Sequence, residues 1–178
     1  MVTTDPRADR MATVLQADGG WTLRYERTLH HPRTKVWRAL TESQHLRHWL
    51  PCDIVGDRRA GAAVELPFWP DVVERYQIAE PVLQGRIEVW EPPEVFEWWW
   101  DGDRLRWELD EQAEHTRLVF TTCIADPTIG ADSAAGYHVC LDRLEGLLDT
   151  GRAVPLEDHP VELQQRYEAA GRARGGGA

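Results

Sequence analysis

Two side chains in this sequence, His138 and Tyr76, are the candidates for acid–base chemistry. A histidine has an ordinary pKa of about 6.5, so His138 could exchange a proton near neutral pH if it faces a cavity. Asp142 and Glu145 fall on the same side of the helix expected around His138, which favours an exposed polar face instead. An enzyme requires at least one of the two candidates to point inward, and no catalytic residue is assigned.

The sequence predicts neither a metal site nor a cofactor. His45 and His48 stand three residues apart on an expected short helix, but zinc would need two more ligands and only Cys52 is near in sequence. The three cysteines, with Cys123 and Cys140, are scattered without a CxxC pair, as expected of reduced thiols in the cytoplasm. The sequence also contains no phosphate-binding loop, dinucleotide fingerprint or nucleophile elbow.

Bulky apolar side chains gather on one face of several expected strands. Side chains alternate between the two faces of a strand, so a strand over 94–101 places Phe96, Trp98 and Trp100 together. Such a wall could line a pocket for a flat or apolar molecule, or it could be a filled core that binds nothing. The residues expected to line the pocket are Ile87, Val89, Phe96, Trp98, Trp100, Leu105, Trp107, Leu118, Phe120, Tyr137, His138 and Leu141.

Trp99 is expected on the opposite face of the same strand, with Glu97 and Asp101 solvated beside it. An exposed tryptophan could belong to an interface, including that of a homodimer, or the segment 152–170 could shield it. Because these carboxylates point away from the expected pocket, the pattern favours a protein that binds a molecule rather than an enzyme that uses acid–base catalysis.

The composition is that of a single globular domain with an acidic surface. Hydrophobic residues make up 42% and charged residues 28% of the 178 residues, which allows a core without disulfides. A net charge of −10 argues against nucleic acid and anionic membranes as partners, because both require a basic face. The N-terminal residues lack the apolar core of a signal peptide and no stretch could span a membrane, so we expect a cytoplasmic location without membrane insertion.

The order of the elements predicts an α+β fold, in which a curved antiparallel sheet wraps around a long C-terminal helix. A sheet with one apolar face must be covered, and only the last long helix has an apolar stripe of sufficient length. That stripe is Tyr137, Leu141, Leu144 and Leu148. The expected organisation is a flexible leader at 1–20, a domain at 21–151 and an extension at 152–178 with a short helix at 160–170 and a flexible tail. Within the domain we expect a strand at 21–30, two short helices over 32–50, strands over 52–125 (one at 72–79) and the long helix from 131.

Three segments of the domain resemble a known family. They are PRTKVWRALT with LRHWL at 32–50, GRIEVWEPPEVFEWWW at 85–100 and AAGYHVCLDRLEGLL at 134–148. In this order they are similar to the SRPBCC superfamily, and within it to the family that resembles the C-terminal domain of the activator of heat-shock-protein-90 ATPase. The resemblance covers about residues 21–150 and implies a helix-grip fold with a cavity between the sheet and the long helix.

The resemblance leaves three functions open. The superfamily includes carriers of hydrophobic ligands, polyketide cyclases and chaperone co-factors, so its fold alone does not decide the function. The leading expectation is a protein that binds a small hydrophobic or aromatic molecule in the cavity. The alternatives are a cyclase-like or hydrolase-like enzyme in the same cavity and a co-chaperone-like interaction protein. The co-chaperones carry a separate N-terminal domain where this chain has about 20 residues, which argues against chaperone stimulation.

Overall fold

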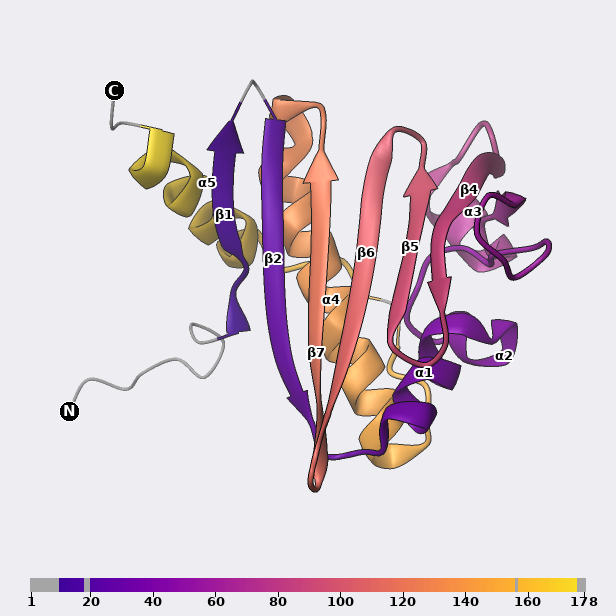
Figure 1. Ribbon diagram of the computed structural model, residues 1–178. Coiled ribbons are helices and arrows are strands. Elements are labelled where there is room, and N and C mark those ends of the chain that lie inside the picture. The colour runs from indigo at the N-terminus through magenta and orange to yellow at the C-terminus, as the bar shows by residue number, and fades with distance from the viewer. Residues whose placement is uncertain (1–9, 18–19, 156, 176–178) are drawn as a thin grey trace.

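The computed structural model describes residues 10–17, 20–155 and 157–175, which form one antiparallel sheet and the helices that cover one of its faces (Figure 1). The sheet has seven strands in the order β1-β2-β7-β6-β5-β4-β3. The strands are β1 (Thr13–Ala17), β2 (Gly20–Leu29), β3 (Ala63–Pro67), β4 (Val82–Glu91), β5 (Val95–Trp100), β6 (Asp103–Gln112) and β7 (His115–Ile124). The helices are α1 (Arg33–Thr41), α2 (Ser43–Leu46), α3 (Pro70–Tyr76), α4 (Gly130–Thr150), α5 (Val161–Gly175) and the short 3₁₀ helix η2 (Pro127–Ile129).

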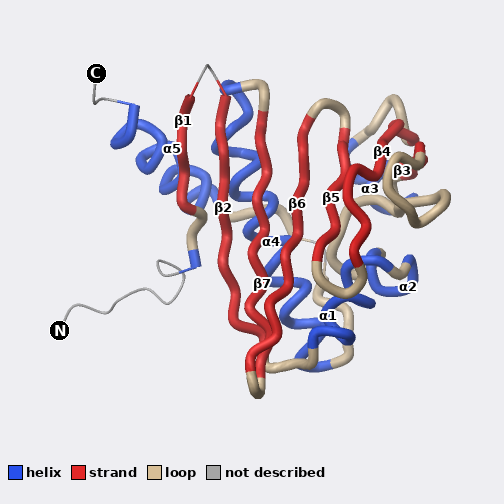
Figure 2. The backbone as a smooth tube through the Cα atoms, in the orientation of Figure 1, coloured by secondary structure: helices blue, strands red, loops and turns tan. Residues whose placement is uncertain are grey.

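The long helix α4 lies across the inner face of the curved sheet, so the helix-grip fold expected from the sequence is confirmed (Figures 1 and 2). Its apolar stripe faces the sheet, where Leu141, Leu144 and Leu148 are buried. Burying this stripe removes apolar area from water and supplies the main attraction between the two layers.

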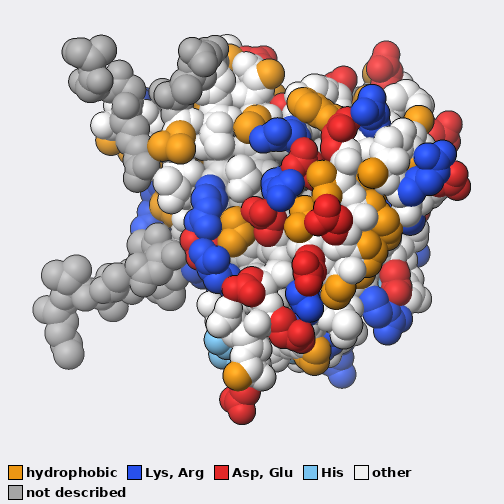
Figure 3. Space-filling model, in the orientation of Figure 1, with side chains coloured by type: hydrophobic (Ala, Val, Ile, Leu, Met, Phe, Trp, Pro, Cys, Tyr) orange, Lys and Arg blue, Asp and Glu red, His pale blue; other side chains and the backbone are white. Residues whose placement is uncertain are grey.

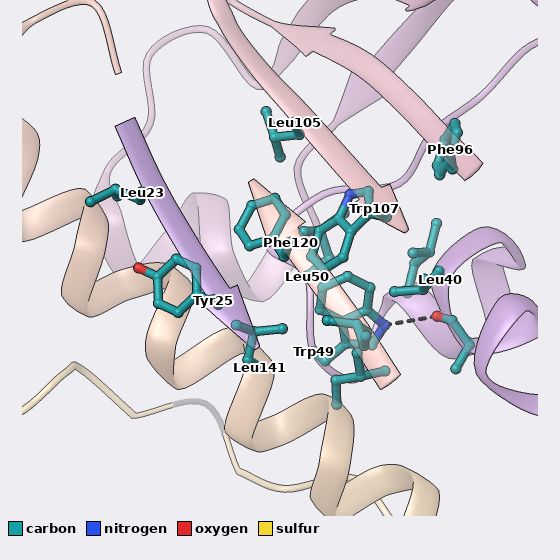
Figure 4. Close-up of a cluster of buried hydrophobic side chains, with 14 of the residues drawn as sticks. Leu23, Tyr25, Leu40, Trp49, Leu50, Phe96, Leu105, Trp107, Phe120 and Leu141 are labelled. Atoms are coloured by element: carbon teal, nitrogen blue, oxygen red, sulfur yellow. Dashed lines mark hydrogen bonds between the residues drawn. The ribbon is translucent and has the colours of Figure 1, made fainter. Parts of the chain in front are cut away.

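Large aromatic side chains fill the middle of the space between sheet and helix. Phe120 of β7 lies opposite both Tyr25 of β2 and Trp107 of β6 in the strand register. The Trp107 and Phe120 rings stack with their centroids 3.9 Å apart, and Trp49 meets Trp107 edge-on at 5.5 Å (Figure 4). Trp49 also donates its indole N–H to the carbonyl oxygen of Ala39, 2.9 Å away. The centre of the domain is therefore a packed core.

The helix α1 closes the end of the core at which β2 stops (Figure 1). Trp37 of α1 packs on Trp90 of β4 at 5.1 Å and on Phe96 of β5 at 6.2 Å. Lys35 donates a hydrogen bond of 2.8 Å to the carbonyl oxygen of Leu148, in the last turn of α4. A cation is favourable there because the last carbonyls of a helix carry partial negative charge.

The strand β1 was not predicted from the sequence, whereas the helix α5 includes most of the short helix expected at 160–170. β1 lies inside the segment expected as a flexible leader, where it pairs with β2, and α5 packs against α4 and β1. Tyr167 of α5 is fully buried there. Its hydroxyl accepts the N–H of Ala12 at 3.0 Å and is hydrogen-bonded to Nδ1 of His138 at 2.9 Å.

Two segments differ from the strands expected between 52 and 79. Residues 70–76 form the helix α3, because Pro70 occupies its first turn, Asp71 adds a favourable charge there and Gln77 ends it with a left-handed φ of 53°. The consecutive valines in this segment resemble a strand, but only Val72 is buried. The segment 52–56 makes two isolated bridges and no full strand.

The outer face of the sheet carries charges of both signs, which Figure 3 shows interspersed over the strands. Glu97 of β5 was expected to be solvated, yet it is only 7% exposed. Its Oε2 atom accepts a hydrogen bond of 2.9 Å from Arg106, and Arg104 lies near its Oε1 atom. The long side chains of these two β6 residues therefore cover Glu97. Trp99 is 37% exposed beside them, and α5 does not shield it because α5 lies at the β1 edge (Figure 1).

None of the described helices combines the length and the apolarity needed to cross a membrane.

We expect the substitution Tyr167→Phe to lower the free energy of unfolding by about 1–3 kcal/mol, because a buried N–H and a buried imidazole each lose a hydrogen bond. The matched control is Tyr76→Phe, which removes an exposed hydroxyl bonded to Asp158 and should cost less than about 0.5 kcal/mol. Urea denaturation followed by circular dichroism measures both values. Equal stabilities of the two variants would contradict the role assigned to Tyr167.

Candidate functional site

A cleft of about 530 Å³ opens at the end of the sheet where β7 stops and α4 begins, the upper end in Figure 1. Its walls come from the turn between β5 and β6, the segment joining β7 to α4, and the first half of α4. The lining residues are Pro51, Leu83, Trp100, Asp101, Asp103, Ala125, Asp126, Ile129, Asp132, Ser133, Gly136, Tyr137, Cys140 and His159.

The aromatic packing of the core continues into the floor of this cleft. Trp100 stacks on Trp98 with ring centroids 5.8 Å apart, and Tyr137 meets Phe120 edge-on at 5.2 Å. Trp98 and Phe120 are buried, whereas Trp100 and Tyr137 keep part of their surface open to the cleft. Apolar ring faces that are held rigidly at a cleft are typical of binding sites for small molecules.

Small residues on α4 keep the cleft open. Gly136 faces it, and a Cβ atom built at this position would meet no heavy atom within 4 Å. Cys140 follows one turn later and also lines the cleft. Burial raises the pKa of its thiol to about 11, so Cys140 stays protonated near neutral pH.

Four carboxylates surround the mouth of the cleft. Asp101 and Asp103 belong to the turn between β5 and β6, which reverses through left-handed φ angles at Asp101 and Gly102. Asp126 caps η2 by accepting hydrogen bonds from Thr128. Asp132 of α4 contacts Nε2 of His159 at 2.8 Å. Neither lysine nor arginine occurs among the described residues that line the cleft.

Asp103 is the most sheltered of these carboxylates. Burial raises its pKa, the neighbouring Asp101 adds to the shift, and the N–H of Ala125, 3.4 Å from Oδ1, opposes it. The pKa of Tyr137 is also raised, first by burial and then by the nearby Asp103. The Tyr137 hydroxyl is therefore protonated near neutral pH, and it is hydrogen-bonded to the side chain of Thr122.

The indole N–H of Trp98 is a buried polar group near the cleft. It has no hydrogen-bond partner among the described residues, although Trp98 is only 1% exposed. Trp98 stacks on Trp100, which lines the cleft. The side chain of Thr122, by contrast, is hydrogen-bonded to Tyr137. An unpaired buried donor costs free energy, which makes the Trp98 N–H a candidate for a hydrogen bond with a bound molecule.

The residues predicted to line a pocket divide into two groups in the structure. Trp100 and Tyr137 line the cleft. The apolar residues that instead form the packed core beneath it are Ile87, Phe96, Trp98, Leu105, Trp107, Leu118, Phe120 and Leu141.

Val89 and His138 lie elsewhere. A β-bulge in β4 shifts the register after Ile87, so Val89 lies opposite Glu97 on the outer face and does not share the face of Ile87 as expected. His138 is 1% exposed and is directed at Tyr167 of α5, not at the cleft.

Sequence reasoning missed the residues that form the mouth of the cleft. Asp101, Asp126 and Pro51 stand outside the regular strands, where alternation does not specify a direction. Asp103 is the first residue of β6 and shares the inner face of Leu105, but it was interpreted as part of the preceding turn. The one local signal was the Asp101–Gly102–Asp103 turn, since aspartate and glycine favour tight reversals.

The other candidate residues do not join this cleft. Tyr76 is 48% exposed, is bonded to Asp158 and lines an adjoining groove of about 500 Å³ between α3 and α4. His45 and His48 line a separate cavity near the end of α4, together with Lys35 and Arg38. The described residues contain no group of three or more potential metal ligands placed to hold an ion.

Solved structures of low sequence identity share this architecture. EF2215 from Enterococcus faecalis, a conserved protein of unknown function, matches with a TM-score of 0.76 and 20% identity, over 94% of this chain and 95% of that one. BPP1335 from Bordetella parapertussis matches with a TM-score of 0.62 and 25% identity, over 92% and 88% of the two chains. DynU16, a protein in the dynemicin biosynthetic locus, matches with a TM-score of 0.60 and 20% identity, over 77% of this chain and 49% of that one.

No curated protein matches the chain at a significant level. Residues 30–149 match the family described as activator of Hsp90 ATPase homolog 1-like protein, and this range extends from the end of β2 to the last turn of α4. The match includes the sheet strands β3 to β7 and most residues that line the cleft. The chain therefore belongs to the family of activator of Hsp90 ATPase homolog 1-like proteins, within the SRPBCC superfamily.

Proposed function

We propose that this protein binds a small apolar or aromatic molecule in the cleft between the β5–β6 turn and the first half of α4. The observation that carries the proposal is a cleft of about 530 Å³ whose floor includes the aromatic side chains of Trp100 and Tyr137. Binding sites for small molecules commonly enclose about 300–1,000 Å³ and are largely apolar. The fold of the family, with its space between sheet and helix, supports the same function.

The alternative functions have less support. A cyclase-like or hydrolase-like enzyme was expected to use His138 or Tyr76, and neither lines the cleft. An interaction through Trp99 would use a side chain that is 37% exposed among paired charges. The free cysteines Cys52, Cys123 and Cys140 support the proposal of a reducing, cytoplasmic environment.

We expect the neutral dye Nile red to bind the wild-type protein with an increase in fluorescence, and Gly136→Phe to weaken this binding at least about tenfold. The phenylalanine ring would enter the open space that Gly136 leaves in the cleft. The matched control is Gly136→Ala, which adds one methyl group and should keep the affinity within about twofold. It should also stabilise α4 by up to about 1 kcal/mol, because alanine favours a helix over glycine. Unchanged dye binding in a folded Gly136→Phe variant would place the dye outside this cleft.

We expect alkylation by a maleimide to report whether the cleft is occupied. Cys140 should react slowly at neutral pH, because its pKa of about 11 leaves little thiolate, and faster as the pH rises. A molecule bound in the cleft should slow Cys140 further and leave the half-buried Cys123, which lies outside the cleft, unchanged. Mass spectrometry of the labelled peptides separates the two sites. Equal protection of both cysteines, or of neither, would argue against binding at this position.

A further inference from the structure

We propose that the molecule held in the cleft carries a positive charge, as an amine or another organic cation, and that Asp103 binds this charge. The inference rests on the proposed function and adds the chemical class of the ligand. It starts from the opposite character of the floor and the mouth of the cleft: the floor is aromatic, and the mouth carries Asp101, Asp103, Asp126 and Asp132.

The acidic residues at the cleft differ from those on the outer face of the sheet in having no arginine partner among the described residues. On the outer face of the sheet, acidic side chains such as Glu26, Glu97 and Glu108 each contact an arginine. At the cleft, Asp101, Asp103 and Asp126 form no ion pair with any described residue, and His159 beside Asp132 is the only lining residue that can become cationic. The negative potential of the mouth is therefore left for a ligand to neutralise.

Asp103 is the carboxylate best placed to contact a molecule in the cleft. It is half-buried at the first position of β6, next to Trp100 across the turn, and its described hydrogen bond, from Ala125, is a long one of 3.4 Å. A cation bound to Asp103 would lie near the rings of Trp100 and Tyr137, whose π faces attract positive charge. The geometry thus combines a carboxylate and aromatic surface, the pairing that recognises organic ammonium groups.

The buried aromatic layer behind Trp100 gives further support for a ligand at this position. The indole N–H of Trp98, which stacks on Trp100, has no hydrogen-bond partner among the described residues. A polar ligand atom that reaches this N–H could accept a hydrogen bond from it. The donor is separate from the acidic mouth, so two features point to a bound molecule.

A metal ion fits these carboxylates poorly. A divalent cation needs several oxygen ligands converging within about 2.0–2.6 Å of one point. The described acidic, histidine and cysteine side chains form no group of three that could hold a metal. Carboxylates spread around an aromatic cleft suit an extended cation, in which the charge is attached to an apolar body.

The test compares three probes that share a naphthalene ring and differ in charge. Naphthylmethylamine is a cation at neutral pH, naphthylmethanol is neutral, and naphthoate is an anion. With isothermal titration calorimetry at low ionic strength, we expect the wild-type protein to bind the amine about tenfold more tightly than the alcohol and to bind naphthoate most weakly, because a hydrogen bond to a charged group outweighs a neutral one.

The substitution Asp103→Asn should reduce the preference for the amine to less than about threefold and leave the affinity for the alcohol unchanged. The matched control is Asp110→Asn, at an exposed position of the same strand, which changes the net charge equally and should keep the preference. Circular dichroism checks that both variants are folded.

The outcomes separate the two proposals. If the alcohol binds the wild-type protein and the amine binds no better, or if Asp103→Asn keeps the full preference for the amine, the inference about charge is wrong and the proposed binding function stands. If none of the three probes binds and Nile red does not bind either, the proposed function itself fails. Loss of the preference in Asp110→Asn as well would show a general effect of net charge and would overturn the assignment to Asp103.

Discussion

The stack of Trp107 on Phe120 at the centre of the sheet determines where this fold can hold a ligand. Two large rings with centroids 3.9 Å apart, enclosed by Trp49, Tyr25 and the helix α4, leave no room in the middle of the domain. Protein interiors tolerate few voids, so the cleft lies at the end of the sheet and not in its centre. The helix-grip fold supplies a space between sheet and helix, and the size of the side chains decides how much of it stays open.

The two ends of α4 illustrate this dependence. At its C-terminal end, Trp37 and its neighbours from β4 and β5 fill the space next to the sheet, Lys35 ties α1 to the last turn of the helix, and the cavity there lies between the helices. At its N-terminal end the residues that line the cleft include Gly136 and Ser133, whose side chains are too small to fill it. The cleft is thus a consequence of small side chains on α4 set against the rigid aromatic wall that the core supports.

Strand alternation predicted the inner wall well and the open site poorly. It placed Phe96, Trp98 and Trp107 on the inner face correctly, because they stand within regular strands where parity determines direction. It misplaced Val89, because a bulge reverses parity and leaves no clear mark in the sequence. Alternation did not distinguish residues that line the cleft, such as Trp100, from residues of the packed core. That distinction depends on how completely side chains from distant segments fill the space around each residue. The strand β1 was missed although a local signal was present: only Asp18 and Gly19 separate it from β2 in the sequence, and an Asp-Gly pair between two strands is typical of a hairpin.

Asp103 explains why the acidic character of the cleft was also missed. Alternation assigns carboxylates such as Glu108 to the outer face, whereas Asp103 shares the inner face of Leu105 and Trp107; it was missed because it is the first residue of β6 and was interpreted as part of the turn. Its raised pKa means that the folded protein holds this proton more tightly than the unfolded chain, so the ionised form destabilises the fold at pH values above the pKa. A cation at Asp103 would offset that destabilisation, because it binds the folded state alone. Partial burial also strengthens the attraction between this carboxylate and a cation, since charges interact more strongly where water is partly excluded. The burial that raises the pKa of Asp103 is therefore also what would make the cleft selective for a charged ligand.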